Sequence, residues 1–331
     1  MKKIFTVILF SGMMLTAASA QTKNTDSRIS DTKTETNETG FTITKIGDGV
    51  YAAIGGDDDP AESNAGFIVG NNGVVVVDTF EDVGAARDLL AEIRKVTNLP
   101  IRYVINTHYH LDHVGGNAVF AEAGATILAH RNLRAWERTE NYKFFGDNPK
   151  PEKRAYVEAF VLPDMTYTDA VDIYLGNRLV QVRYMLGHTG GDSVVIVPSA
   201  KNYTDDIVFG GDLLWKNRVP NLIDASTDLW IETLDKFLTN YAKAVFVPGH
   251  GEVADSGDVR FFRDYFTALR KSVAKFQKEG KSGDALIEAV MAELKPAYGK
   301  WTFFDPFVKR GIALTAAELK GEKRLPVPAK N

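Results

Sequence analysis

The stretch Thr107-His108-Tyr109-His110-Leu111-Asp112-His113 decides how this sequence is interpreted, because it concentrates side chains that bind metal ions. It contains three of the six histidines of the chain, together with an aspartate. Imidazole and carboxylate groups are ligands that zinc prefers in proteins. Loops seldom concentrate histidines in this way, so the stretch predicts a metal site, and a metal site of this kind indicates an enzyme.

The segments around this stretch predict an α/β fold. Residues 101–105 read as a strand, which places the histidines on a loop at the carboxyl end of a strand, where open sheets place their sites. The valines at 74–77 are apolar on both faces and predict a buried central strand, and residues 82–97 have helical apolar spacing. The same patterns predict further strands at 41–46, 49–54, 65–69, 125–129, 171–175, 179–185, 193–197, 207–210 and 244–247, and helices at 117–123, 130–138 and 228–241. Two sheets with helices outside them would bury both sheets.

The first residues resemble a cleavable export signal. Lys2 and Lys3 precede a mostly apolar run, and Ala18-Ser19-Ala20 is a small-residue cleavage pattern. The apolar run is shorter than the roughly 20 residues that span a bilayer, so an uncleaved anchor is the less favoured alternative. We expect a periplasmic or secreted protein without stable membrane insertion after cleavage.

Changes in composition divide the chain into four regions. The segment after the signal is polar, with almost no apolar residues, and predicts a disordered leader. After Asp255 the pattern becomes helical, with helices predicted at 259–278 and 284–294. The four regions are a signal peptide at 1–20, a leader at 21–40, a catalytic domain at 41–255 and a C-terminal helical extension at 256–331.

The composition excludes several classes of ligand and partner. The chain has no cysteine, so a metal site must use His, Asp or Glu side chains. Its formal net charge is −4 and the sequence has no basic stripe, so we expect no nucleic-acid partner. A small-molecule substrate is the expected partner, and the C-terminal helices are a candidate surface for oligomerisation.

Three further polar residues sit beside glycines at or near the ends of predicted strands. These are His188, Asp212 and His250. Glycine lets the backbone bend tightly at such points, and a buried aspartate needs a partner such as a metal ion. A turn aspartate is the alternative for Asp212, since Asp readily occupies turns. His130 lacks glycine neighbours and is interpreted as structural, whereas Asp78 is expected to cap the next segment or to support the histidine loop by a hydrogen bond.

The order of these residues resembles the metallo-β-lactamase superfamily. The series is His108-x-His110-x-Asp112-His113, then His188, Asp212 and His250, and the resemblance covers residues 41–253. It implies an αββα sandwich of two mixed β-sheets flanked by helices, with the site at one edge of the sheets. It also implies two zinc ions per chain. The first zinc would be held by His108, His110 and His188, the second by Asp112, His113 and His250, with Asp212 bridging both.

Several positions separate this sequence from particular branches of the superfamily. One group of lactamases carries cysteine where this chain has Asp212, and another carries serine. An aspartate there is similar to glyoxalase II-like thioesterases, lactonases and other non-lactamase hydrolases. The diiron oxygen-reducing branch typically has glutamate where His110 stands, and the nuclease branches usually carry an additional nucleic-acid-binding domain or arm, which this sequence lacks.

The resemblance implies an exported dizinc hydrolase. A hydroxide shared by the two zinc ions would attack the carbonyl of a small ester, lactone, lactam or thioester, and Asp112 is the candidate catalytic residue that orients this nucleophile and later passes a proton. A β-lactamase acting on antibiotics is the first alternative. A phosphodiesterase and a metal-binding protein without turnover are the others.

The pocket walls are less well marked in the sequence. Residues 141–152 are predicted to form a polar and aromatic loop, a candidate rim over the site. The loop at 141–153, the segment 215–224 and the helices after residue 255 are expected to shape the walls, and the C-terminal helices would form a substrate cover or a dimer face. Phe144, Phe145 and Trp215 are candidates to line an apolar entrance or simply to pack. Tyr109 has the same two interpretations.

Overall fold

The computed structural model describes residues 40–56, 59–199 and 206–326. The predicted signal and all but the last residue of the predicted leader lie outside these ranges, so both stay predictions. Within the described ranges, no helix combines the length and the apolar character that crossing a membrane would require.

The first β-sheet contains seven strands that follow one another in chain order. Neighbours from β1 to β4 pair antiparallel, and neighbours from β4 to β7 pair parallel, so the sheet is mixed. Its strands are β1 (Phe41–Gly47), β2 (Val50–Gly55), β3 (Ala65–Val69), β4 (Val74–Val77), β5 (Ile101–Ile105), β6 (Thr126–His130) and β7 (Met165–Tyr167). The valine run forms β4 in the middle of this sheet and is completely buried, as the sequence predicted.

The second β-sheet contains five strands in the order β12-β11-β10-β9-β8. All neighbours pair antiparallel except β11 and β12, which pair parallel. Its strands are β8 (Ala170–Tyr174), β9 (Leu179–Tyr184), β10 (Ser193–Val197), β11 (Ile207–Trp215) and β12 (Val245–His250).

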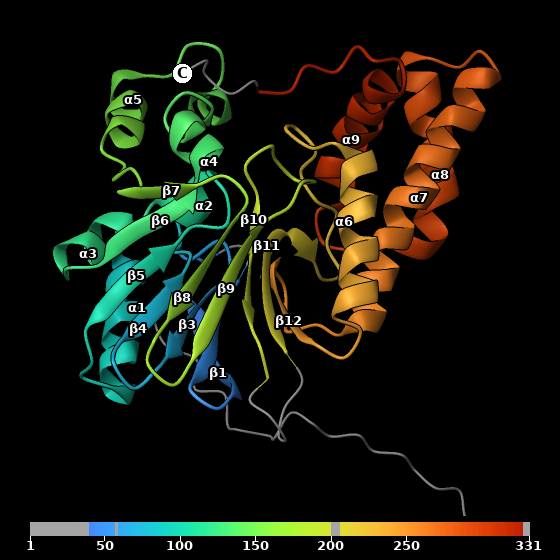
Figure 1. Cartoon of the computed structure of the whole chain (residues 1–331). Coiled ribbons are helices and arrows are strands. Elements are labelled where there is room, and N and C mark those ends of the chain that lie inside the picture. The colour runs from blue at the N-terminus through green and yellow to red at the C-terminus, as the bar shows by residue number, and fades with distance from the viewer. Residues whose placement is uncertain (1–39, 57–58, 200–205, 327–331) are drawn as a thin grey trace, which may run out of the picture. The chain divides into compact units, whose positions relative to one another are not determined.

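Alternating side chains build the layers of an αββα sandwich, which confirms the predicted fold (Figure 1). Val75 and Val77 of β4 point into the core between the two sheets, where they join Val195 and Phe209 of the second sheet. The intervening valines of β4 face the opposite way, as the two-residue period of a strand requires, and pack against α1 (Val83–Val96) and α3 (Asn117–Glu122). Four helices cover the outer face of the second sheet: α6 (Thr227–Asn240), α7 (Ser256–Lys278), α8 (Gly283–Tyr298) and α9 (Phe304–Leu319).

The C-terminal helices attach to the sandwich through an apolar and largely aromatic cluster. Phe262 and Phe266 of α7 contact Trp230 of α6, with ring centroids 5.7 and 4.6 Å apart. The predicted helices at 259–278 and 284–294 are confirmed as parts of α7 and α8. Sequence patterns missed α9, because Pro306 and a glycine interrupt its apolar periodicity. Pro306 is tolerated there because it lies in the first turn, where backbone N–H groups have no helical partner. The predicted domain boundary after residue 255 stays a prediction.

The segment between β6 and β7 is more ordered than the predicted loop at 141–152. It contains α4 (Arg131–Trp136), a 3-10 helix η1 (Asn141–Phe145) and α5 (Pro151–Glu158). Pro151 occupies the first turn of α5, a position that proline favours. The prediction of a loop at 141–152 was therefore wrong at both of its ends, where η1 and the start of α5 lie. Polar and aromatic residues without clear periodicity gave no sign of these helical turns in the sequence.

Candidate metal centre

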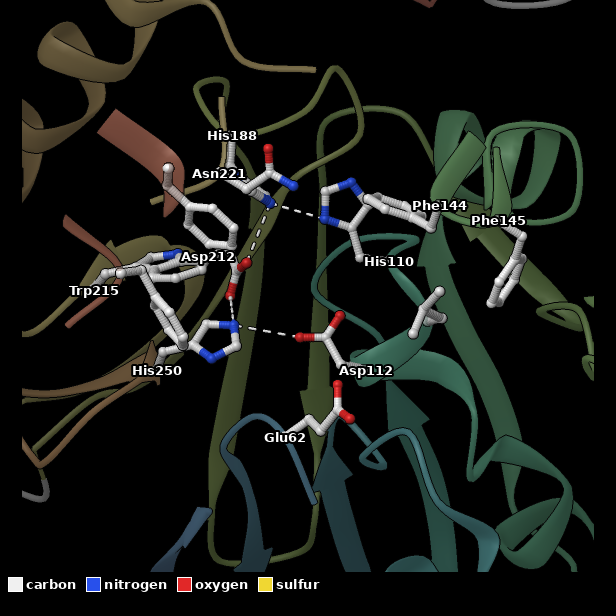
Figure 2. A pocket seen from close by; sticks show the side chains of 13 residues that line it. Glu62, His110, Asp112, Phe144, Phe145, His188, Asp212, Trp215, Asn221 and His250 are labelled. Carbon is white, nitrogen blue, oxygen red and sulfur yellow. Dashed lines mark hydrogen bonds and ion pairs between the residues drawn. The ribbon is translucent and has the colours of Figure 1, made fainter. Parts of the chain in front are cut away.

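All seven predicted ligand residues come together at one edge of the two sheets. Figure 2 shows His110, Asp112, His188, Asp212 and His250 of this set. Their possible ligand atoms form two groups, and within each group these atoms lie within 4.8 Å of one another. The first group contains His108, His110, His188 and Asp212, and the second contains Asp112, His113 and His250. The structure thus assembles the cluster that the sequence predicted, and that each residue binds a metal ion remains a prediction.

Strand ends and turns deliver these side chains. His108 and His110 lie on the loop that follows β5. Asp112 and His113 lie in the short helix α2 (Leu111–Val114), which this loop enters, and His188 follows β9. His250 is the last residue of β12, which extends beyond its predicted end at residue 247. Asp212 lies inside β11, so its predicted place after a strand ending at residue 210 was wrong. The strand continues through Gly210-Gly211 because irregular pairing with β12 accommodates this pair of glycines.

Asp212 lies between the two groups of candidate ligands. Its Oδ2 atom is 3.1 Å from Nε2 of His188, in the first group. Its Oδ1 atom is 3.1 Å from Nε2 of His113 and 3.3 Å from Nε2 of His250, in the second group. One carboxylate oxygen therefore faces each group, which is the arrangement expected of a bridging ligand.

The donor atoms of the cluster fit a pair of metal ions. Nε2 of His108, Nε2 of His113 and Oδ1 of Asp212 are buried and lie near opposite charges of the cluster, yet none of their contacts with described residues has the geometry of a hydrogen bond. Nδ1 of His110 and Nε2 of His188 face each other at 2.9 Å. Buried polar atoms without partners are costly and rare in proteins. A cation bound between these atoms would satisfy all of them, and the mixture of imidazole and carboxylate donors suits zinc.

The charges of the cluster balance each other internally. Burial opposes ionisation of Asp212, but His250 and His113 outweigh it and hold the pKa of this carboxyl well below its usual range. Burial likewise opposes ionisation of Asp112, and His113 and His250 again reverse the effect, so its pKa also falls well below the usual range. Both side chains are therefore carboxylates at neutral pH, which is the form that binds metal ions.

Asp78 supports the histidine loop by hydrogen bonds, as predicted. Its carboxylate accepts hydrogen bonds from the backbone N–H and the hydroxyl of Thr107, both at 2.7 Å. It also lies 2.8 Å from Nδ1 of His113, which directs Nε2 of that ring toward the cluster. Asp78 has a φ of 56°, a left-handed conformation that Asp tolerates better than most residues.

Asp224 supports His110 in the same way, and no sequence pattern singled it out. Its Oδ2 atom is 3.0 Å from Nε2 of His110, and its Oδ1 atom accepts a hydrogen bond of 2.5 Å from Nζ of Lys143. Burial opposes ionisation, but His110 and Lys143 hold the pKa of Asp224 below its usual range. The ring nitrogen that faces the cluster is then Nδ1, because Asp224 occupies the other nitrogen.

Close packing around the cluster explains one glycine and one asparagine. A Cβ atom on Gly249 would lie 1.9 Å from Oδ1 of Asp212, so only glycine fits there. Asn64 donates hydrogen bonds to the carbonyls of Pro248 (2.8 Å) and Gly251 (2.7 Å). These bonds connect the first sheet to the turn that carries His250, and they fix the position of that ring.

Two aromatic residues singled out in the sequence lie outside the cluster. The ring of His130 stacks on Tyr184, with centroids 3.9 Å apart, and its Nε2 atom bonds the carbonyl of Thr168 at 2.9 Å. Its predicted structural role is confirmed. Tyr109 is fully buried against Trp136 and does not line the cavity, so the packing interpretation holds for it.

A cavity of about 390 Å³ opens above the two groups. Phe144 and Phe145 lie on one side of it and Trp215 on the other, as Figure 2 shows, which confirms these three as wall residues. Glu62 lies next to Asp112 at one end. The residues that line the cavity are Glu62, His110, Leu111, Asp112, Phe144, Phe145, His188, Asp212, Trp215, Asn221, His250, Phe303 and Phe307.

Sequence reasoning missed Glu62 as a wall residue. Asn221, Phe303 and Phe307 lie in regions that were expected to shape the walls, although none of the three was singled out. Glu62 also has a half-buried carboxyl partner, Glu81. Burial, the charge of Glu62 and the charge of Asp112 together raise the pKa of Glu81 to about 8, so Glu81 holds a proton at neutral pH. No motif marks these positions, and the repeated aromatic residues between 301 and 307 were the one available signal.

Comparison with known proteins places this chain in a family. The family model that matches the chain is described as Metallo-beta-lactamase superfamily, and it covers residues 58–250, more than half of the chain. A type 2 metallo-beta-lactamase of Bacillus cereus is 28% identical over 230 residues, which make up 67% of this chain and 81% of that protein. A linear primary-alkylsulfatase of Pseudomonas sp. is 22% identical over 258 residues, 66% of this chain but only 48% of that protein.

Solved structures of the same fold agree with these matches. A metallo-beta-lactamase from Pontibacter korlensis superposes with a TM-score of 0.56 at 23% identity, covering 69% of this chain and 99% of that one. A double mutant of the sec-alkyl sulfatase PisA1 superposes with a TM-score of 0.60 at 16% identity, covering 84% of this chain and 50% of that one. At these identities the likeness concerns the fold.

Proposed function

The chain belongs to the metallo-beta-lactamase superfamily of metal-dependent hydrolases, and from this premise we propose that it binds two zinc ions and hydrolyses a small carbonyl substrate. The observation that carries the proposal is the position of Asp212, with one carboxylate oxygen toward each group of ligand atoms. The donor set of imidazoles and carboxylates supports zinc.

In the proposed reaction, the protein side chains hold and orient the reacting groups. When bound, two zinc ions supply Lewis acidity and a water molecule that ionises near neutral pH. Asp212 fixes the separation of the two groups, and Asp78 and Asp224 fix the orientation of His113 and His110. Asp112 lines the cavity, where its carboxylate would orient the attacking water, take up the proton that the water loses and then pass that proton to the leaving group.

The proposed substrates are small esters, lactones, lactams and thioesters. Asp212 in place of cysteine or serine supports this breadth rather than a dedicated antibiotic-degrading enzyme. β-Lactam hydrolysis is the second candidate, and the 28% identity to a protein named as a type 2 metallo-beta-lactamase favours it. Phosphodiester hydrolysis and metal binding without turnover have no comparable support.

We also propose the location and partners that the sequence predicts. Export to the periplasm or secretion rests on the signal-like residues 1–20, and a small-molecule substrate without nucleic acid rests on the acidic charge. Oligomerisation through the C-terminal helices is a further proposal.

Metal analysis combined with a hydrolysis screen tests the proposed function. We expect about two zinc ions per chain by elemental analysis, loss of activity after chelation, and recovery after zinc is added. The screen compares an uncharged acyl lactone, a cephalosporin, a glutathione thioester and a phosphodiester. Metal content well below two, with no turnover of any of the four, would overturn the proposal. Cephalosporin hydrolysis far above the other rates would favour the second candidate.

A further inference from the structure

We propose that Phe303 and Phe307 form a substrate-selecting wall, which favours uncharged substrates that carry an apolar chain or ring beside the reacting carbonyl. This inference rests on the proposed function. Both residues line the cavity above the candidate metal centre. Both lie beyond residue 250, where the match to the family model ends, so the wall lies outside the matched region.

The wall is continuous with the metal centre through aromatic contacts. The rings of Phe303 and Phe307 have centroids 5.1 Å apart, and Phe303 lies 6.2 Å from Trp215. Trp215 in turn lies 4.0 Å from the ring of His250, a candidate ligand. An apolar group bound against Phe303 and Phe307 would therefore have its reacting end next to the metal centre.

Backbone pairing holds this wall in place. The N–H of Val219 donates to the carbonyl of Thr302 at 2.9 Å, and the N–H of Thr302 donates to the carbonyl of Asn217 at 3.0 Å. These bonds tie the start of α9 to the segment that follows Trp215. Phe303 itself has a φ of 63°, which is uncommon for a bulky residue and persists only where the surrounding structure enforces it.

The two wall residues contribute less to the core than their neighbours do. Phe304, Val308 and Ile312 form the buried stripe of α9, at the spacing expected for one helix face. Phe303 and Phe307 are only half-buried, and their remaining surface faces the cavity. An apolar ligand would remove that surface from water, which is the main source of binding energy for such groups.

The rest of the lining indicates that the substrate is uncharged. Among the described residues, no lysine or arginine lines the cavity, while Glu62 adds a carboxylate to those of the candidate ligands. Phe144 stands on the opposite side, with its ring 5.1 Å from that of His110. The resulting slot has aromatic walls and offers no lysine or arginine to an anionic substituent that lies against Phe303 and Phe307, so a carboxylate or sulfate held there, away from the metal centre, would lose its hydration without compensation.

A chain-length series tests the wall. Hydrolysis of uncharged lactones with linear acyl chains of about two to ten carbons should become faster with length. One methylene group in an apolar pocket can change kcat/KM by about tenfold or more. In the double variant Phe303→Ala/Phe307→Ala, we expect kcat/KM for the longest substrate to fall by at least about tenfold and the rate on the shortest to stay within about twofold. Tyr174→Ala, which removes an aromatic side chain that is 70% exposed on β8, is the matched control.

A second measurement separates the wall from the proposed function. Binding of linear primary amides, followed by tryptophan fluorescence, needs no turnover and should show the same dependence on length and on the two phenylalanines. Length-dependent amide binding without hydrolysis of any lactone, cephalosporin, thioester or phosphodiester would overturn the proposed function and leave the wall intact. Hydrolysis with an unchanged length dependence in the double variant would overturn the wall and leave the function intact.

Leucine variants and a charged lactone test the shape and the charge preference of the wall. If the double alanine variant does not fold, Phe303→Leu and Phe307→Leu keep most of the apolar volume while changing its shape, and they should alter the preference between chains and phenyl rings by about threefold or more. A lactone whose chain ends in a carboxylate should react at least about tenfold more slowly than its uncharged counterpart. Equal preference in the leucine variants, or equal rates for the charged and uncharged lactones, would overturn the corresponding part of the proposal.

Discussion

The floor and the walls of the cavity are built in different ways. The floor is the candidate metal centre, whose seven residues are almost all buried, with five of them lining the cavity and with rings held by carboxylates such as Asp78 and Asp224. The walls comprise the buried Trp215 of β11 and half-buried aromatic side chains from η1 and the start of α9, held by packing and by a few backbone bonds. This difference indicates a division of labour, in which the floor fixes the type of reaction and the walls select the substrate. It also means that the walls can change without disturbing the metal centre.

Removing the bridging carboxylate should produce the largest effect and would break the floor. We expect Asp212→Ala to lower kcat/KM by about a thousandfold or more, because both groups lose a ligand and the repulsion between bound cations is no longer screened. Elemental analysis should find fewer than two zinc ions per chain. Circular dichroism serves as the control for folding. A folded variant that keeps two zinc ions and its activity would remove Asp212 from the metal centre.

Weakening the hydrogen bond between Asp224 and His110 should have an intermediate effect on zinc binding. Asp224→Asn keeps the shape of the side chain but removes the charge that orients His110, so zinc affinity should fall by about 10–100-fold. Competition with a chromophoric chelator measures this affinity, and excess zinc should restore most of the activity. Asp172→Asn, which changes an aspartate on β8 that is paired with Arg183 away from the site, is the control. Equal affinities in the two variants would show that Asp224 does not support the metal centre.

Shortening a wall residue should have a smaller effect and should leave the floor intact. In Phe144→Ala, we expect KM for a long-chain substrate to rise by about tenfold because apolar contact is lost. The zinc content and the rate on the shortest substrate should stay unchanged. A fall in zinc content would contradict the separation of walls and floor, because Phe144 contacts the ring of His110.

The last effect concerns the free energy of unfolding rather than the activity. It arises at a buried carboxyl that precedes the wall segment η1 in the chain. Glu137 is buried, its carboxylate oxygens have no hydrogen-bond partner among the described residues, and burial raises its pKa to about 8. Between the ordinary pKa of 4.5 and this value the folded state binds more protons than the unfolded state, so stability falls as pH rises through this interval.

Glu137→Gln should remove that dependence on pH. Relative to the unmodified protein, the variant should gain up to about 1.4 kcal/mol of unfolding free energy for each pH unit across this interval. Denaturant unfolding at pH 5 and at pH 8 measures the difference. Carboxylates of the floor behave in the opposite way, because neighbouring histidines keep them ionised. A gain that is equal at both pH values would contradict the raised pKa of Glu137.

Local patterns were sufficient to predict most of the fold. The valine run of β4 and the alternating strands around it are confirmed, since burial on one or both faces is encoded in consecutive residues. The wall segments were harder to predict: η1 and α5 were expected to be a loop, and α9 fell in the predicted helical extension without bounds of its own, because these segments mix polar, aromatic and proline residues without a clear period. Their helical turns form because their side chains pack on surfaces that other parts of the chain provide.

The sequence by itself determined which residues make up the candidate metal centre, because ligand type and order are carried by short local motifs such as residues 108–113. Only the tertiary structure decided how these residues meet and what surrounds them. Asp224 lies 114 positions from His110, and Phe303 follows Trp215 only after three intervening helices. Such contacts depend on how sheets and helices pack across long stretches of chain. No local pattern encodes that packing, so it could be read only from the folded protein.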